Sequence, residues 1–502
     1  MPYIKVTTDS GVKTLSFSLG ESVFDILTKN GISTGAACGG KGRCGKCGVT
    51  AKPAPPPCEA DKRFFTDDEL ARGARLSCLL FLDTDAEISL LGGGDAGFEA
   101  MSAGVSCCGK TGGSLHIAID IGTTTVALCL TDEHENILAA RASVNPQRMY
   151  GADVISRITA SNEGKGEELR SLIRRFLLEE TAELIKGADK ERISSVVISG
   201  NTTMGHLFLG YPCETLGVFP FTPVDISLMR MSFEEAFGSA LLNCETILLP
   251  GISTYVGADI SSGMLYCDMD GSDETNLFID LGTNGEMVIG RRGSFLCAST
   301  AAGPAFEGGN ISCGTGSVPG AVCSVDILGE SVHFKTISDA PPCGICGTGA
   351  VETVSELLKT GLMDETGMLD EEIFEDGLRI ADGIYFTQKD VREMQLAKAA
   401  VRAGIETLML RYGADCQSIK HVYVAGGFGY KLDIKKASLM GMFPAGLEDK
   451  IVPVGNSSLL GAVRFACGRQ GIERIVNDTR EIGLSEDKDF GELYIEHMYF
   501  GG

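Results

Sequence analysis

The chain has 502 residues, of which 44% are hydrophobic and 22% charged, with no tryptophan and a formal net charge of −24. Such a length exceeds what one hydrophobic core supports and predicts about three units of ~100–200 residues. The acidic balance argues against a nucleic-acid partner, which selects a basic surface. No run of ~18 apolar residues and no signal-peptide pattern is visible, so we expect no membrane contact and a cytoplasmic location.

The first 90 residues predict a small α+β domain of the β-grasp type. Residues 3–19 alternate in polarity around a turn at 9–11, which predicts a β-hairpin. Residues 22–29 (SVFDILTK) then predict a short amphipathic helix capped by Ser22. A loop rich in glycine and cysteine follows.

Four cysteines of this domain, Cys38, Cys44, Cys47 and Cys78, have the spacing C-x5-C-x2-C-x30-C. A glycine-rich loop can wrap closely around an iron–sulfur cluster and direct amide groups at its sulfur atoms. The loop resembles that of the bacterial and adrenodoxin-like [2Fe–2S] ferredoxins. Cys58 competes for the fourth ligand position, but it follows three prolines in a predicted loop, so Cys78 is favoured. A four-thiolate zinc site usually pairs two C-x2-C knuckles, and this segment has one.

Residues 91–113 contain eight glycines and few large apolar side chains, which predicts a flexible linker. Beyond it the sequence repeats itself. Residues 115–120 predict a strand that runs into DIGTTT at 120–125, and residues 277–280 predict a strand that runs into DLGTNG at 280–285. Each copy continues with two further predicted strands, at an offset of 160 residues. This duplication predicts two lobes, at 114–271 and 272–502.

Each repeat carries a candidate phosphate loop. Its glycine and hydroxyl residues offer N–H and O–H groups to phosphate oxygens, and the aspartate at the strand end can hold Mg²⁺. The carboxylates Asp120, Asp280 and Glu286 suit one metal ion and an attacking water in phosphoryl transfer. The candidate ATP-binding residues of the two loops are Gly122, Thr123, Thr124, Thr125, Gly282, Thr283, Asn284 and Gly285.

A third glycine-rich segment, VYVAGGFG at 422–429, predicts a strand that breaks where an adenosine could lie against bare backbone, at Gly426, Gly427 and Gly429. Small residues at 257–264 and 456–462 predict two helices that approach closely, as a hinge between lobes requires. A Walker A pattern is not visible, which argues against a P-loop fold.

The order of these motifs over residues 114–468 resembles the actin, Hsp70 and sugar-kinase superfamily of ATPases, which implies duplicated RNase H-like lobes that bind ATP and Mg²⁺. Four segments are more particular: NPQRMYGAD at 145–153, SGNTTM at 199–204, AAGPAFEG at 301–308 and ICGTG at 345–349. They resemble the reductive activators of corrinoid-dependent methyltransferases, which join a [2Fe–2S] ferredoxin domain to such an ATPase.

This resemblance implies an enzyme that uses ATP hydrolysis to pass one electron from its cluster to a Co(II) corrinoid protein, restoring Co(I). It also implies an unidentified low-potential electron donor and a homodimer. Two alternatives remain open: an ATP-coupled donor to another low-potential enzyme, and a redox-sensing ATPase or kinase. The pair Cys343 and Cys346 has a C-x2-C spacing, but we interpret it as a glycine-rich turn with two buried thiols.

Overall fold

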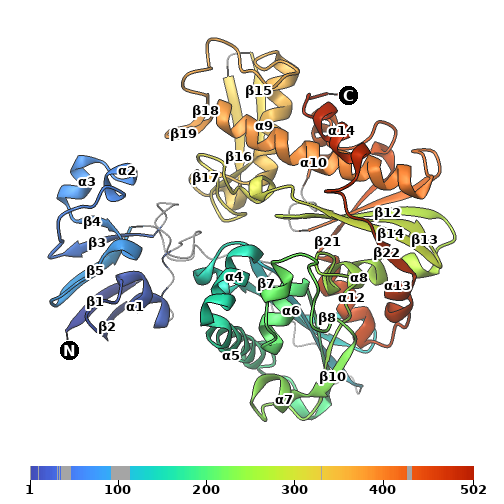
Figure 1. Cartoon of the computed structure of the whole chain (residues 1–502), viewed down its shortest axis with the longest axis horizontal. Coiled ribbons are helices and arrows are strands. Elements are labelled where there is room, and N and C mark those ends of the chain that lie inside the picture. Colours follow the sequence, from blue (N-terminus) through green and yellow to red (C-terminus); the bar gives the residue numbers. More distant parts are fainter. Residues whose placement is uncertain are drawn as a thin grey trace.

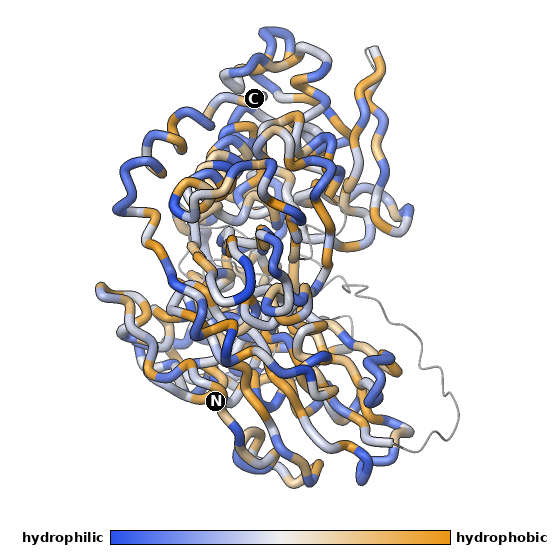
Figure 2. Tube along the Cα trace, turned by 90° about the vertical axis from the view of Figure 1, so that its right-hand side faces the viewer, coloured by the Kyte–Doolittle hydropathy of each residue, from blue (hydrophilic) through white to orange (hydrophobic). Residues whose placement is uncertain are grey.

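The computed structural model describes residues 2–8, 11–30, 32, 34, 47–91, 113–329, 331–426 and 432–501. Figure 1 shows a small N-terminal unit beside two larger lobes, each built on a mixed sheet with helices packed against it. In Figure 2 the hydrophobic residues gather along the strands inside the lobes, and hydrophilic residues follow the outer helices and loops. In the described part of the chain, the helices are all too short or too polar to span a bilayer.

The N-terminal unit is a five-stranded sheet with the strand order β2-β1-β5-β3-β4. Its elements are β1 (Tyr3–Thr8), β2 (Gly11–Ser16), α1 (Val23–Lys29), β3 (Gly48–Lys52), α2 (Asp61–Phe64), α3 (Asp67–Ala71), β4 (Ala74–Leu76), the 3-10 helix η1 (Ser77–Leu79) and β5 (Ala86–Leu90). The predicted hairpin is confirmed, with Thr8 opposite Gly11. The predicted cap is confirmed too, because the Ser22 hydroxyl accepts a hydrogen bond from the Asp25 amide at 3.1 Å.

Lobe I is a six-stranded sheet with the order β10-β11-β9-β6-β7-β8. Its strands are β6 (Leu115–Ile121), β7 (Thr125–Asp132), β8 (Ile137–Val144), β9 (Ile193–Gly200), β10 (Met229–Ser232) and β11 (Glu245–Leu248). Its helices are η2 (Pro146–Tyr150), α4 (Val154–Ala160), α5 (Gly166–Leu184), α6 (Thr202–Leu209), α7 (Phe233–Phe237) and α8 (Ala258–Tyr266).

Lobe II contains a second six-stranded sheet, β21-β20-β12-β13-β14-β22, and two small sheets, β16-β15-β17 and β18-β19. Its strands are β12 (Thr275–Leu281), β13 (Gly285–Arg291), β14 (Ser294–Thr300), β15 (Ala321–Leu328), β16 (Ser331–Thr336), β17 (Gly344–Ile345), β18 (Leu378–Ala381), β19 (Ile384–Phe386), β20 (Ile419–Ala425), β21 (Ile451–Gly455) and β22 (Thr479–Glu481). Its helices are η7 (Pro304–Glu307), α9 (Gly347–Thr360), α10 (Gln388–Tyr412), α11 (Ile434–Leu439), α12 (Ser457–Ala466), α13 (Ile472–Asp478) and α14 (Lys488–Glu496).

The predicted duplication is visible in the strand pairing. In lobe I, β11, β9 and β6 run parallel and β7 and β8 follow antiparallel. In lobe II, β21, β20 and β12 run parallel and β13 and β14 follow antiparallel. The same five-strand unit therefore occurs twice, and the expected fold class, a ferredoxin-like unit with two related α/β lobes, is confirmed.

Two helices of small residues join the lobes, as their sequences predict. The Ser262 hydroxyl on α8 donates a hydrogen bond to the Ser458 carbonyl on α12 at 2.7 Å. A Cβ atom on Gly461 would lie 1.9 Å from the Ser262 carbonyl oxygen, and one on Gly263 would lie 2.5 Å from the Phe278 ring. The absence of side chains at Gly263 and Gly461 therefore sets how closely the lobes approach.

We expect Gly461→Ala to destabilise the paired lobes by about 3 kcal/mol or more, because the added methyl group meets backbone that has no room to move. The control is Gly491→Ala on the exposed face of α14, where a Cβ meets nothing within 4 Å and alanine favours the helix. Thermal unfolding of both variants checks this. Equal midpoints would contradict the close packing of α8 on α12.

Candidate cluster and nucleotide sites

Two of the predicted cluster ligands lie side by side in the N-terminal unit. Cys47 comes directly before β3 and Cys78 lies in η1, directly after β4. Because β3 and β4 pair antiparallel with Gly48 opposite Leu76, the two sulfur atoms meet at 3.2 Å. Both thiols are buried. The hydrogen bond with Cys78 is the main reason why the pKa of Cys47 falls to about 6, which favours the thiolate that binds metal.

The other candidate ligands divide between the described and undescribed parts of the chain. Cys38 and Cys44 lie outside the described residues. Cys58 is exposed, whereas Cys78 is packed against Cys47, so the structure brings together the pair that the sequence favours. A buried pair of thiols, one of them acidic, fits a thiolate-bound iron–sulfur cluster.

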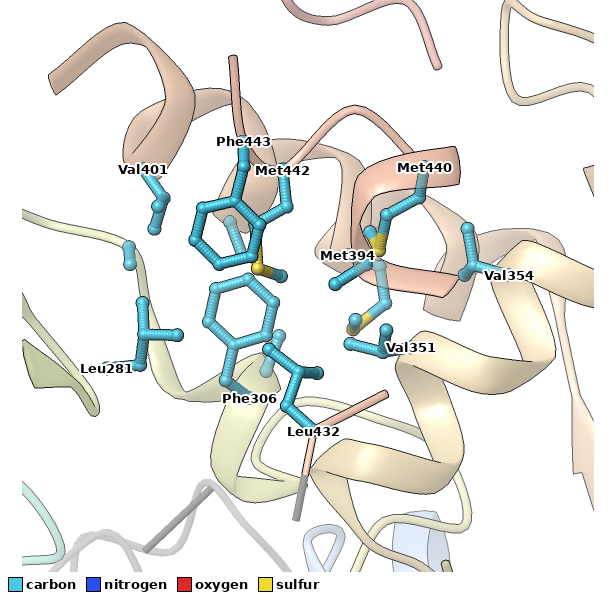
Figure 3. Packing of buried hydrophobic residues seen from close by; sticks show 14 of the residues in the cluster. Leu281, Phe306, Val351, Val354, Met394, Val401, Leu432, Met440, Met442 and Phe443 are labelled. Carbon is cyan, nitrogen blue, oxygen red and sulfur yellow. The ribbon is translucent and has the colours of Figure 1, made fainter. Parts of the chain in front are cut away.

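Two carboxylates of lobe II directly adjoin side chains of its hydrophobic core. Asp280 precedes Leu281, and Glu307 follows Phe306 in η7. Figure 3 shows Leu281 and Phe306 in the lobe II core, in a cluster that includes Phe443. Each carboxylate is therefore held next to a fully packed side chain, while it remains partly accessible to solvent itself.

Five carboxylates gather where the two lobes meet. Asp120 is the second-last residue of β6, and Asp280 is the second-last residue of β12, with Glu286 as its cross-strand partner on β13. Asp259 lies in the first turn of α8, and Glu307 ends η7. Burial raises all five pKa values. Repulsion from neighbouring carboxylates adds to burial at three of them, so that the pKa of Asp280 rises to about 7, that of Asp259 to about 8, and that of Glu286 well above its ordinary value.

Hydrogen bonds from both lobes hold two of these carboxylates in place. Asp120 accepts hydrogen bonds from Asn456 Nδ2 at 2.9 Å and from the Ser458 hydroxyl at 2.7 Å, both from the start of α12 in the other lobe. Glu307 accepts a hydrogen bond from the Thr283 hydroxyl at 2.8 Å. Hydrogen bonding with Thr124 of lobe I also lowers the pKa of Glu307, so this side chain joins the two phosphate loops.

The donor set fits Mg²⁺ bound together with a nucleotide. Within the described ranges, no three acidic, histidine or cysteine side chains converge closely enough to hold a metal by themselves. Mg²⁺ usually takes one or two carboxylates, several waters and the phosphates of its substrate, and it favours oxygen ligands of this kind. Positive charge at this position would also relieve the repulsion that raises the carboxyl pKa values.

The two phosphate loops differ in their turns. The Gly122 amide donates to the Thr125 carbonyl at 3.0 Å, whereas the Gly282 amide donates to the Asn284 carbonyl at 3.0 Å, one residue sooner. This shorter turn places Glu286 opposite Asp280, while the residue opposite Asp120 is Ala127. The loops are therefore related by duplication, but of the two only the lobe II loop has a carboxylate opposite its aspartate.

Lobe I fixes its phosphate loop with side chains that the sequence analysis did not select. Asn145 Nδ2 donates to the Gly122 carbonyl at 2.8 Å, and Asn201 Nδ2 donates to the Thr123 hydroxyl at 2.8 Å. The buried guanidinium of Arg157 binds the Thr123 carbonyl, and burial lowers its pKa to about 9.

Gly426 has a position that only glycine fits. Its φ is +93°, and a Cβ would lie 2.6 Å from the Leu281 carbonyl oxygen. Gly200 occupies the related position in lobe I, where a Cβ would lie 2.6 Å from the Ile121 carbonyl oxygen. Gly427 and Gly429 lie outside the described residues.

Asp259 and Glu307 were missed as site residues, although both lie in segments that the sequence analysis had marked for other reasons. Asp259 belongs to the small-residue helix, where an acidic residue in the first turn was the available signal.

The interpretation of Cys343 and Cys346 as two buried thiols is correct for one residue. Cys346 is buried and its thiol donates to the Val322 carbonyl at 3.2 Å, but Cys343 is exposed. Cys343 ends the loop before β17, and its thiol donates to the Pro319 carbonyl at 3.6 Å.

Comparison with known families agrees with this arrangement. Residues 7–83 match the 2Fe-2S iron-sulfur cluster binding domain, residues 115–272 the RACo middle region, and residues 274–502 the C-terminal domain of RACo, the ASKHA domain. ASKHA is the ATPase type to which the duplicated lobes and paired loops belong.

Individual relatives share most of the chain. The corrinoid activation enzyme RamQ of Eubacterium limosum is 31% identical over 422 residues, which cover 77% of this chain and 70% of RamQ. A Co(II) methylated amine-specific corrinoid protein reductase of Methanosarcina barkeri is 29% identical over 76% of each chain. The solved structure of a reductive activator for a corrinoid, iron-sulfur protein has a TM-score of 0.69 at 26% identity, covering 100% of this chain and 98% of that one.

With a ferredoxin-type cluster domain, an ASKHA ATPase with its ATP and Mg²⁺ site, and 31% identity to RamQ over 77% of the chain, the chain belongs to the family of reductive activators of corrinoid proteins.

Proposed function

We propose that this chain is an ATP-dependent reductive activator, which passes one electron from its [2Fe–2S] cluster to the Co(II) form of a corrinoid protein and so restores Co(I). The observation that carries the proposal is the presence in one chain of a buried cysteine pair, Cys47 and Cys78, and a carboxylate site shared by two ATPase lobes. An electron carrier and a nucleotide-driven machine are thereby covalently joined.

On the electron-transfer side, Cys38, Cys44, Cys47 and Cys78 would hold the cluster. Clusters of the plant type lie near ~−400 mV. Reducing a centre that is ~150 mV more negative costs about 3.5 kcal/mol per electron, since ~59 mV corresponds to ~1.4 kcal/mol for a one-electron couple. A cost of this size is within the range that nucleotide-dependent closure of two lobes can supply.

On the nucleotide side, Mg²⁺ when bound would neutralise charge on the phosphates. Asp120 and Asp280, from opposite lobes, would hold it, and Asn456 and Ser458 fix the orientation of Asp120. Glu286 is our candidate to orient the attacking water and to accept its proton, because it lies directly opposite Asp280 on the neighbouring strand, and bound positive charge would relieve the repulsion that keeps it protonated in the metal-free site. The loop hydroxyls and amides of both repeats, with Gly426, Gly427 and Gly429 on the adenosine side, would bind the rest of ATP.

We also propose that the chain divides into a ferredoxin-like domain at 1–90, a linker at 91–113, and two ATPase lobes at 114–271 and 272–502. The cytoplasmic location is supported by the 18 cysteines of the chain, which suit a reducing compartment. The separate low-potential donor and the homodimer rest on the resemblance to the family.

The direct test is anaerobic reduction of a Co(II) corrinoid protein by the purified, chemically reduced chain, followed by the absorbance of Co(I). We expect Co(I) to form with Mg·ATP and not with Mg·ADP. The absence of ATP-dependent Co(I) formation from several corrinoid proteins, with an intact cluster, would contradict the proposed activity.

Glu286→Gln should lower ATP hydrolysis by about 10²–10⁴-fold, because it removes a proton acceptor and keeps the shape of the side chain. ATP-dependent Co(I) formation should fall with it, while the absorbance of the cluster stays unchanged. The matched control is Glu473→Gln on an exposed face of α13 in the same lobe. A Glu286→Gln enzyme that hydrolyses ATP normally would remove Glu286 from the mechanism.

The metal-free chain should lose thermal stability as the pH rises from about 4 to about 8. Asp280 and Asp259 have pKa values of about 7 and about 8 in the folded state, so the folded chain keeps protons that the unfolded chain, with carboxyl pKa values near ~4, releases. This stability is complete below the unfolded pKa and is lost as the pH passes through the folded pKa.

Melting temperatures in chelator at about pH 6 and about pH 8.5 measure this loss. Asp259→Asn should make it smaller, since an amide neither titrates nor repels Asp280. Mg·ADP should restore more stability at the higher pH. A pH dependence that is the same in Asp259→Asn and in the unmodified chain would contradict the carboxylate cluster.

A further inference from the structure

We propose that the 3-10 helix η2 (Pro146–Tyr150) links nucleotide binding to the docking of the ferredoxin domain on lobe I, and that bound phosphates weaken this docking. The inference deepens the proposed function by naming how the ATPase site reaches the cluster domain. It rests on contacts that η2 makes in three directions.

The first direction is the phosphate loop. Asn145, which is fully buried, donates from Nδ2 to the Gly122 carbonyl and from its backbone amide to the Thr124 carbonyl, both at 2.8 Å. Its Oδ1 accepts a hydrogen bond from the Gln147 amide at 2.9 Å and so caps η2. A displacement of the loop therefore moves the start of η2 with it.

The second direction is the opposite lobe. The positive charge of Arg148 on η2 acts on Glu307 and lowers its pKa, although burial raises the pKa more. Arg148 is thus a cation of η2 that is within electrostatic reach of the nucleotide site. Phosphates bound there add negative charge, which draws Arg148 further towards the site.

The third direction is the ferredoxin domain. Met149 and Tyr150 of η2 and Phe24 and Thr28 of α1 line a shared cavity of about 170 Å³ between the two domains. Figure 1 shows α1 on the side of the N-terminal unit that faces α4 and α5. The cavity shows that these surfaces face each other with unfilled space between them, so the docking is loosely packed.

Charged groups of both domains lie near this cavity. Glu168 on α5 accepts hydrogen bonds from the Tyr150 hydroxyl at 2.9 Å and from Lys165 Nζ at 3.0 Å. Across the cavity, Lys29 at the end of α1 is within electrostatic reach of Glu168, although Lys29 is hydrogen-bonded to Glu21 of its own domain at 2.5 Å. An attraction weaker than an exposed ion pair, which contributes ~0–1 kcal/mol, leaves the docking reversible.

Helix α1 also lies next to two of the proposed cluster ligands. Phe24 of α1 packs against Cys47, Leu76 and Cys78 in one buried group. The segment that faces η2 is therefore the helix that covers the described cysteine pair. Movement of Arg148 towards bound phosphates would withdraw Met149 and Tyr150 from α1 and release the cluster domain towards its redox partners.

The test uses the full-length protein and hydrogen–deuterium exchange of α1 and of residues 149–168, with and without Mg·AMPPNP. We expect AMPPNP to raise exchange in both segments. Thr28→Glu places a negative charge opposite Glu163 and Glu168 and should raise exchange without nucleotide. The control Thr14→Glu introduces the same charge on the exposed edge strand β2 of the same domain and should leave exchange unchanged.

If bound nucleotide weakens the docking of the ferredoxin domain, thermodynamic linkage requires that weaker docking strengthens nucleotide binding. The Thr28→Glu variant should therefore bind the nucleotide more tightly. We expect Thr28→Glu to lower the Kd for Mg·AMPPNP by about 5-fold or more, and Thr14→Glu to leave it unchanged. Exchange that does not respond to Thr28→Glu would show that the two surfaces are not in contact. Exchange that responds, with an unchanged Kd, would overturn the link to nucleotide. Neither readout involves the corrinoid protein, so each outcome is independent of the proposed reductase activity.

Discussion

The hydrogen bonds that Asp120 accepts from Asn456 and Ser458 tie a candidate catalytic carboxylate of one lobe to the hinge helix of the other lobe. The contact exists because α8 and α12 approach at Gly461, which places the start of α12 over the end of β6. The position of Asp120 thus depends on the angle between the lobes. A change in that angle on nucleotide binding would move Asp120 relative to the proposed metal position. Movement at the hinge and phosphoryl transfer would therefore be coupled.

The carboxylate cluster is a second constraint, because it is unfavourable without a cation. Asp259, Asp280 and Glu286 repel one another in a poorly solvated place, and their pKa values rise accordingly. Such an arrangement destabilises the empty site and favours the state with Mg²⁺ and nucleotide. The free energy of relieving this repulsion is available for closing the lobes, which is where an activator needs it.

Much of this architecture could be predicted from the sequence because duplication leaves a local signal. The paired motifs at 120–125 and 280–285 lie on strand–turn–strand units whose alternation and turn residues are readable, and both hairpins formed as expected. Asp259 and Glu307 were missed because the fold, and not a local sequence motif, brings them close to the loops. Asp259 lies on a helix and Glu307 follows a glycine-rich segment, and each is distant from the loops in sequence. The exposure of Cys343 was likewise not readable, because spacing alone does not say which side of a turn a thiol faces.

The separation of cluster and ATPase into different cores has a mechanical consequence. The N-terminal unit has its own hydrophobic core, built from residues such as Ile4, Val6, Ile26 and Ile88, and this core is independent of both lobes. Among the described residues, moving the unit as a whole therefore leaves this core intact, and it changes the loosely packed region between α1 and lobe I. Closing or opening the two lobes, in contrast, works against the tightly packed α8–α12 contact. An electron carrier that must approach a large partner gains reach from this arrangement, while the nucleotide site keeps the rigid geometry that phosphoryl transfer requires.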